Sequence, residues 1–261
     1  VLGLAFDGTG FGSDGTIWGG EVLVCQRDRF QRVAHLKPVP MPGAAAAVGE
    51  PWRMAVADLA ATFKNDALDL GLPLLEAVGP AKVGVVGQMI AKGINAPRTS
   101  SIGRLFDAVA ALAGLRQTVS FEGQAAMELE GIADPDEPGL YPFGWGEGDV
   151  VEVRFAPIVE GVVKDTLAAI PAPVVAARFH NTLVTLFAEL GRHLARRYHL
   201  ERVVLSGGVF QNARLLTGLV RALTQRGLTV YTHRLVPSND GGLCLGQAVA
   251  AAAMASRSST G

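Results

Sequence analysis

The chain has 261 residues, of which 49% are hydrophobic and 18% are charged, with a net charge of −1. This is enough apolar material for a large folded core, which excludes an intrinsically disordered chain. No basic run marks a nucleic-acid binder, and no apolar stretch reaches the roughly 20 residues that a membrane-spanning helix needs. We therefore expect a soluble protein with neither a nucleic-acid partner nor a membrane partner.

The two cysteines, Cys25 and Cys244, lie far apart, and neither belongs to a Cys-x-x-Cys pair. Their spacing indicates neither a zinc ribbon nor a disulfide framework, which favours a reducing cytoplasmic location. Cys25 falls in a strand pattern and Cys244 at the start of an apolar helix. We interpret both as small core residues rather than as nucleophiles.

The first half of the chain predicts strands followed by helices. Residues 1–6 and 21–25 are strand-like runs separated by a polar, glycine-rich segment, and residues 29–42 indicate a further strand or loop. The chain starts within a strand, with no initiator Met or signal peptide, so we expect it to be a piece of a longer one. Between residues 52 and 115 apolar residues recur at helical spacing, which predicts a helical layer.

The second half predicts a long helix and then a β–loop–α–β unit. Its expected elements are a strand at residues 150–155, an amphipathic helix at 176–198, a strand at 202–205, a helix at 212–223, a strand at 228–231 and a small-residue helix at 243–254. The alternation of short apolar strands with helices is typical of an α/β fold.

Three glycine-rich turns are the most informative local feature. They are Asp7-Gly8-Thr9-Gly10, Ser206-Gly207-Gly208 and Asn239-Asp240-Gly241-Gly242. Glycines let the backbone approach an anion closely, and a helix start offers free N–H groups, so such turns suit a phosphate. One Gly-Gly turn is as often purely structural, but three turns that also bear acids suggest one shared site.

The acids in two of these turns suggest a metal ion. A carboxylate beside a phosphate is repelled unless a cation lies between them, so Asp7 and Asp240 are candidate ligands of a divalent metal. The alternative is that each carboxylate only caps its own turn.

Paired phosphate turns on an α/β chain are typical of the actin, hexokinase and Hsp70 group, in which a nucleotide lies between two lobes. We predict a two-lobed α/β fold of this type that lacks the N-terminal part of its first lobe. Residues 1–261 would form one domain, with residues from 1 to about 100 as the remainder of the first lobe and residues 101–261 as the second lobe.

Six blocks of sequence resemble the C-terminal part of HypF carbamoyltransferases. They are FDGTGFGSDGTIWGGE at residues 6–21, SIGRLFDAVA at 101–110, FEGQAAMELE at 121–130, HNTL at 180–183, LSGGVFQN at 205–212 and NDGGLCLGQ at 239–247. The blocks occur in the same order as in that family and span nearly the whole chain. The resemblance implies a domain related to the tRNA threonylcarbamoyl transferases and to antibiotic O-carbamoyltransferases.

The resemblance also implies a reaction. In HypF-like proteins an upstream adenylate-forming domain makes carbamoyl-adenylate from carbamoyl phosphate and ATP. This domain would then pass the carbamoyl group to the C-terminal cysteine of a HypE-type partner, which leads to the cyanide ligand of NiFe-hydrogenases. Two alternatives remain open: an O-carbamoyltransferase that acts on a small-molecule hydroxyl, and a non-catalytic nucleotide-binding scaffold.

Residue roles follow from the resemblance as well. The residues implied to bind ATP or carbamoyl-adenylate are Gly8, Thr9, Gly10, Asp107, Glu122, Gly123, Asn181, Ser206, Gly207, Gly208, Asn212 and Gly241. The glycine turns would line the phosphates, and Asn212 and Gly123 would lie near the adenine. Asp107 would bind the ribose, because a carboxylate can accept hydrogen bonds from two hydroxyl groups.

Asp7, Asp240 and His180 are implied as catalytic residues, with Asp7 and Asp240 as ligands of an iron, zinc or magnesium ion. Family members carry two further metal-binding histidines, one helical turn apart, just upstream of the first residue of this chain. None of the five histidines here replaces them, since even His193 and His199 are six residues apart and so lie on different helix faces. We therefore expect the fragment to be inactive alone.

Several of these residues have a purely structural alternative. Glu122 could only cap a helix start, and His180 and Asn181 could only pack and cap the long helix. Arg98 and Arg104 could bind carbamoyl phosphate or a carboxylate of the partner, but both could equally be solvated surface residues.

Overall fold

The computed structural model describes residues 1–258, apart from the side chains of residues 65, 257 and 258. The strands are β1 (Leu2–Phe11), β2 (Ile17–Cys25), β3 (Phe30–Leu36), β4 (Val39–Pro40), β5 (Arg98–Thr99), β6 (Gly144–Trp145), β7 (Val151–Arg154), β8 (Arg202–Ser206) and β9 (Thr229–Tyr231). The α-helices are α1 (Ala45–Gly49), α2 (Trp52–Phe63), α3 (Pro73–Val78), α4 (Pro80–Lys92), α5 (Ile102–Leu112), α6 (Gln124–Ile132), α7 (Ala156–Leu167), α8 (Ala172–Arg197), α9 (Ala213–Gln225) and α10 (Leu243–Ser258). Three short 3-10 helices are η1 (Lys64–Leu68), η2 (Gly208–Gln211) and η3 (Asp240–Gly242).

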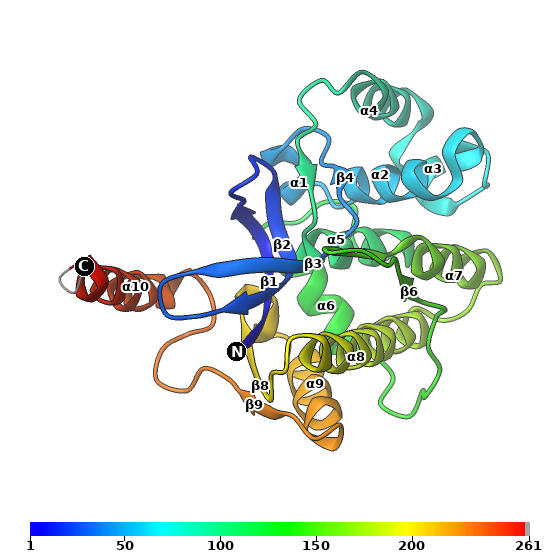
Figure 1. Cartoon of the computed structure of the whole chain (residues 1–261). Coiled ribbons are helices and arrows are strands. Elements are labelled where there is room, and N and C mark those ends of the chain that lie inside the picture. Colours follow the sequence, from blue (N-terminus) through cyan, green and yellow to red (C-terminus); the bar gives the residue numbers. More distant parts are fainter. Residues whose placement is uncertain (259–261) are drawn as a thin grey trace.

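The strands of the described residues form one mixed sheet in the order β6-β7-β3-β2-β1-β8-β9, with β5 beside β2 and β4 beside β5 (Figure 1). Strand β1 is central: it pairs antiparallel with β2 and parallel with β8. Strands from both sides of residue 100 thus share one sheet and one core. The lobe boundary near residue 100 stays a prediction.

The core lies between β1 and the helices. Leu2, Leu4 and Phe6 are fully buried on one face of β1, because side chains of a strand alternate between its two faces. The ring of Phe6 packs on Phe187 of α8, with 4.5 Å between ring centroids, and stacks on Phe210 of η2 at 5.0 Å. These contacts hold the middle of β1, where the first glycine turn begins, against α8 and η2.

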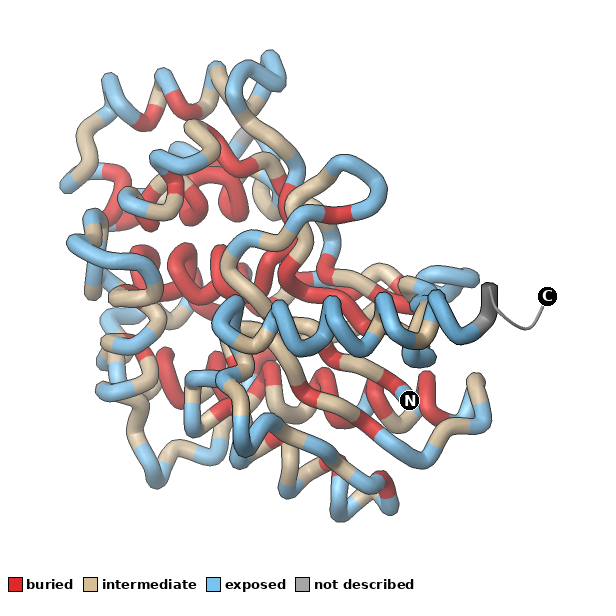
Figure 2. The backbone as a smooth tube through the Cα atoms, turned by 90° about the vertical axis from the view of Figure 1, so that its left-hand side faces the viewer, coloured by how far each residue is buried: buried red, intermediate tan, exposed pale blue. Residues whose placement is uncertain are grey.

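Helices α5 and α10 differ sharply in burial (Figure 2). Every residue of α5 is buried, and α2, α6 and β1 pack around it. Helix α10 is exposed along almost its whole length and makes its main contact with the adjacent η3. The prediction that Cys244 is a core residue is therefore wrong, because this helix leaves its thiol exposed, whereas Cys25 on β2 is half-buried.

Most predicted elements are present, with changes at their ends. Strand β1 does not stop at residue 6 but continues through the first glycine turn to Phe11, because Gly10 and Phe11 pair again with β2 after a register shift. Helix α8 begins at Ala172, four residues earlier than predicted, since a proline is tolerated in the first helical turn. No helix among residues 1–258 is both long and apolar enough to cross a bilayer.

Candidate functional site

The first glycine turn lies where β1 meets the start of α5. The backbone N–H of Gly8 donates to Asp7 Oδ1 at 2.8 Å. A Cβ atom on Gly103 would stand 2.8 Å from Gly8 Cα, and a Cβ on Gly19 would collide with the Asp7 carbonyl oxygen. The backbone at Gly19 and Gly103 therefore packs directly on the backbone of Asp7 and Gly8, and only glycine at these two positions leaves room for that contact.

The second turn lies beside the first because β1 and β8 are parallel neighbours. Ser206 is in register with Ala5, and Gly207 follows with φ of 111°, a conformation that favours glycine. A Cβ on Gly207 would collide with the Phe6 carbonyl oxygen. Ligands bind outside the carboxyl ends of parallel strands. The second turn follows the end of β8, and the first turn begins just after the residues of β1 that pair in parallel with β8.

The third turn joins the other two. The N–H of Gly207 donates to the Ser238 carbonyl at 2.9 Å. A Cβ on Gly208 would stand 3.0 Å from Asp7 Oδ1 and 3.8 Å from Asn239 Cβ. The structure thus brings the first turn together with two turns that lie some two hundred residues later in the sequence. Asp7, Gly208 and Asn239 meet at their centre.

The cluster is rich in negative charge. Burial raises the pKa of Asp7, and the nearby carboxylates of Asp240 and Glu122 raise it further, while the N–H groups of Gly8 and Gly208 oppose the rise. Such a cluster suits a cation, but residues 1–258 contain no group of three or more His, Cys, Asp and Glu side chains that could hold a metal ion. Asp7 and Asp240 can supply part of a ligand set, so the metal site stays a prediction.

Helix α5 brings a buried ion pair to the first turn. Arg104 and Asp107 are each 3% exposed, and Arg104 Nη1 lies 3.0 Å from Asp107 Oδ2. Burial raises the pKa of Asp107 to about 6; Arg104 lowers it and Glu122 raises it. The interpretation of Arg104 as a solvated surface residue is wrong, because every residue of α5 is buried. Arg98, in contrast, is exposed and donates to the Pro38 carbonyl.

His180 is fully buried under the start of α9. Its Nδ1 lies 2.7 Å from the Ala176 carbonyl oxygen and its Nε2 lies 2.9 Å from Asn212 Nδ2. Burial lowers the pKa of His180 to about 4. Both ring nitrogens are engaged within the protein, and Nε2 holds Asn212, which fits the packing alternative. The catalytic role of His180 stays a prediction.

Asn212 and Asn181 are also engaged within the protein. Asn212 Oδ1 accepts from the Leu215 N–H at 2.8 Å and so caps α9. Asn181 Nδ2 donates to the carbonyls of Glu137 and Gly139 at 2.8 and 3.0 Å. Asn212 is thus the N-cap of α9, whereas Asn181 lies within α8 and ties that helix to the loop before β6. A contact of either side chain with a nucleotide stays a prediction.

The other residues predicted to bind the nucleotide lie at the first turn or in the third turn. Glu122 lies at the first turn, 3.1 Å from where a Cβ on Gly8 would stand, and Gly123 next to it begins α6 with φ of 81°. Thr9 is exposed and Gly10 pairs with Trp18 on β2. The third turn, which contains Gly241, is largely exposed.

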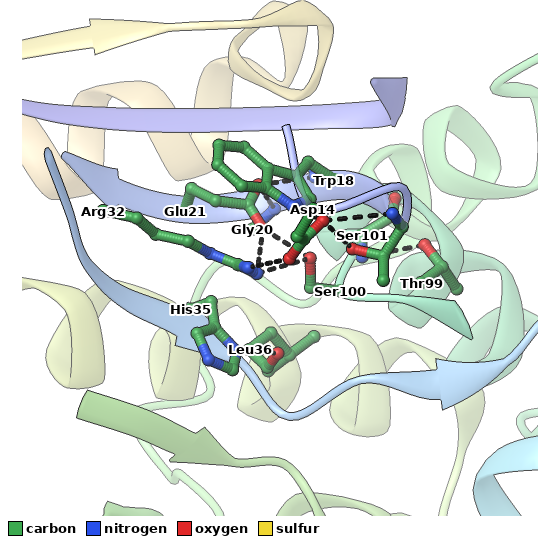
Figure 3. Close-up of polar contacts among 12 residues, drawn as sticks. Asp14, Trp18, Gly20, Glu21, Arg32, His35, Leu36, Thr99, Ser100 and Ser101 are labelled. Carbon is green, nitrogen blue, oxygen red and sulfur yellow. Dashed lines mark hydrogen bonds and ion pairs between the residues drawn. The ribbon is translucent and has the colours of Figure 1, made fainter. Parts of the chain in front are cut away.

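Sequence reasoning did not identify one buried carboxylate near the first turn, that of Glu21 (Figure 3). Glu21 of β2 is 1% exposed; it accepts the N–H groups of Gly19 and Gly20 at 2.6 and 2.7 Å and binds Arg32 and the hydroxyl of Ser100. Burial raises the pKa of Glu21, and these partners lower it. One acid in a strand gives no sequence signal for such a network.

Ser101 links this network to the site. Its hydroxyl donates to the Asp7 carbonyl oxygen at 2.6 Å and accepts the Arg104 N–H at 3.1 Å, so it caps α5 and ties the helix to the first turn. A serine just before an apolar helical run is a recognisable N-cap signal, but its second bond to Asp7 is a tertiary contact.

Comparisons with known proteins match almost the whole chain. The family model described as carbamoyltransferase, Kae1-like domain, second subdomain, matches residues 3–247. Carbamoyltransferase HypF of Rhizobium leguminosarum bv. viciae is 41% identical over 251 residues, which are 95% of this chain and 31% of that protein. HypF of Rhodobacter capsulatus is 42% identical over 262 residues, which are 97% of this chain and 32% of that protein.

Solved structures agree. The crystal structure of full-length HypF in the phosphate- and nucleotide-bound form matches with a TM-score of 0.91 at 39% identity, over 96% of this chain and 32% of that one. The structure of T. kodakarensis HypF matches with a TM-score of 0.83 at 31% identity, over 95% of this chain and 34% of that one. The predicted α/β fold class and the resemblance are confirmed. The chain spans about a third of the length of the curated relatives it matches.

Proposed function

Because the chain belongs to the Kae1-like carbamoyltransferase domain family of HypF proteins, we propose that it transfers a carbamoyl group from carbamoyl-adenylate to a partner's cysteine. The adenylate would be made with ATP by an upstream domain of the same polypeptide. The acceptor would be the C-terminal cysteine of a HypE-type protein in the cytoplasm, on the route to the cyanide ligand of NiFe-hydrogenase. The observation that carries this proposal is the meeting of three glycine-rich turns around Asp7.

The chemistry needs positioning rather than a nucleophile from this chain. The partner's thiol loses its proton to solvent, and its sulfur attacks the carbamoyl carbon. The bond between that carbon and the phosphate oxygen then breaks, and AMP leaves with the electron pair. The glycine turns allow backbone N–H groups close to the phosphate, where they stabilise the charge that develops on it.

A divalent cation belongs to this proposal as an expectation. Asp7 and Asp240 would hold it, and it would supply positive charge between the carboxylates and the adenylate phosphate. Since the described residues provide only part of a ligand set, the proposal takes the other ligands from outside residues 1–258, such as the upstream histidine pair of the family.

The test offers carbamoyl-labelled adenylate to the chain together with the upstream domains of its own polypeptide. The acceptors are a peptide ending in cysteine, the same peptide ending in serine, and aminoglycoside and cephem alcohols. We expect label on the cysteine peptide alone. Transfer only to an alcohol would establish the O-carbamoyltransferase alternative, and tight nucleotide binding without any transfer would establish the scaffold alternative.

A further inference from the structure

Arg104 is buried in the first turn of α5 with most of its hydrogen-bonding capacity unused. Within the part of the chain that the structure describes, its Nε and Nη1 have no hydrogen-bond partner, although Nη1 lies 3.0 Å from Asp107 Oδ2. Asp107 Oδ2 likewise accepts no hydrogen bond. A buried guanidinium whose donors stay unpaired is costly, so this pair is incomplete as it stands.

The guanidinium points at the first glycine turn. Arg104 Nη2 lies 3.4 Å from the point where a Cβ on Gly8 would stand, and Glu122 Oε1 lies 3.1 Å from the same point. The helix itself is pressed against this turn, because Ser101 caps α5 while donating to the Asp7 carbonyl oxygen. A ligand atom held over Gly8 would therefore meet Nη2 directly.

The guanidinium of Arg104 favours an anionic ligand atom at a turn that is otherwise acidic. The carboxylates of Asp240 and Glu122 act electrostatically on Asp7. Arg104 brings positive charge to the same turn and is held from behind by Asp107. A planar guanidinium fork with free N–H groups matches the oxygens of a phosphate. Ribose and adenine would gain no comparable charge interaction from it.

We propose that Arg104 is a phosphate-binding residue, which donates N–H groups to a phosphoryl oxygen of the nucleotide at the glycine turns, while Asp107 positions the guanidinium. This inference rests on the proposed function, because it assigns a residue to the phosphate of the same nucleotide. Asp107 Oδ2 faces Arg104, and a contact of Asp107 with ribose stays a prediction.

The test compares the affinities of AMP and adenosine for the full polypeptide, which includes the upstream domains, by isothermal titration calorimetry. In the unaltered protein AMP should bind more tightly than adenosine. Arg104→Gln should weaken AMP binding at least tenfold and leave adenosine binding unchanged, with Arg104→Lys in between. Arg178→Gln, which breaks the ion pairs of another helical arginine with Glu137 and Asp165, is the matched control and should leave the ratio of the two affinities unchanged.

Two outcomes overturn the inference alone: equal losses of AMP and adenosine binding in Arg104→Gln, or unchanged AMP binding. If the unaltered protein binds neither ligand, the proposed function fails together with the inference. Where Arg104→Gln is poorly folded, the double variant Arg104→Gln with Asp107→Asn removes both buried charges. The inference is supported if the double variant melts at the temperature of the unaltered protein but binds AMP no more tightly than adenosine. It is contradicted if the double variant binds AMP as tightly as the unaltered protein does.

Discussion

The two halves of the candidate site are built differently. The Asp7 half is cross-linked, because Ser101, Glu21 and the close-packed glycines tie β1, β2 and α5 into one buried unit. The Asp240 half is an exposed turn that leads into the exposed helix α10. Hydrogen bonds tie this segment to the second turn, from the Gly207 N–H to the Ser238 carbonyl and between the side chains of Ser206 and His233.

The difference shows that Asp7 and Asp240, which were predicted to bind the same metal ion, contribute differently to the stability of the fold. Substitutions in the Asp7 half should unfold the protein as well as disable it, because the site there is part of the core. Substitutions in the Asp240 half should change chemistry with little effect on stability. Four predictions test this contrast, from the largest expected change in the free energy of unfolding to the smallest.

The largest effect is expected at Glu21. Glu21→Ala leaves the buried side of Arg32 and two N–H groups without their acceptor, so we expect a loss of about 3–5 kcal/mol in the free energy of unfolding. Urea denaturation followed by circular dichroism measures it. Glu50→Ala, which breaks the partly exposed ion pair with Arg53, is the control and should cost no more than about 1 kcal/mol. Similar losses in the two variants would show that the network beneath Asp7 is not structural.

The next effect concerns pH and Asp107. The pKa of Asp107 is about 6 in the folded chain against 3.8 unfolded, so between these values the folded state binds more protons. Stability from this group is therefore full below about pH 4 and is lost as pH rises through 6, by about 3 kcal/mol in total. Asp107→Asn should remove this part of the pH dependence between pH 4.5 and 7.5.

The measurement is urea unfolding of both proteins across that pH range. Asp149→Asn, at a fully exposed acid, serves as the control and should follow the unaltered protein. If the stability of Asp107→Asn changes with pH in parallel with that of the unaltered protein, the carboxyl of Asp107 is ionised across the whole pH range and its pKa is not raised.

A smaller effect is expected where α5 touches the first turn. Gly103→Ala places a Cβ 2.8 Å from Gly8 Cα, and backbone cannot yield as a flexible side chain would, so we expect a loss of about 1–3 kcal/mol. Gly84→Ala in α4, where a Cβ would meet nothing within 4 Å, should instead stabilise the protein by up to about 1 kcal/mol. Thermal melts of the two variants that shift in the same direction would contradict this account of the contact.

Local patterns in the sequence predicted the elements well but not the contacts of the site. Apolar periodicity located α8 and β8, and glycine-rich composition located the three turns. Their meeting was an inference from shared character, since the parallel pairing of β1 with β8 brings the first two turns together and the bond from Gly207 to Ser238 adds the third. The reading of Cys244 failed because an apolar helix start indicates burial only where the fold supplies a covering surface.

Side-chain roles were harder to predict for a physical reason. His180 follows Phe179 on an apolar face, and nothing local shows that Asn212, thirty-two residues away, occupies one ring nitrogen. Glu21 is a single acid in a strand, and its four partners come from its own strand, the neighbouring strand β3 and the loop before α5. Buried polar networks are assembled by tertiary contacts, so spacing along the chain carries no signal of them.

The smallest effect on stability is expected at Asp240, which lies in the exposed third turn. Asp240→Ala should change the free energy of unfolding by no more than about 0.5 kcal/mol, because exposed turn residues contribute little. Carbamoyl transfer by the full polypeptide should nevertheless fall at least tenfold, since the variant removes a charge that faces Asp7. Asp136→Ala, at an exposed acid in the loop after α6, is the control for both measurements. A variant at Asp240 that keeps its nucleotide affinity and its full transfer rate would refute a metal-assisted role, and a large loss of stability would refute the contrast between the two halves.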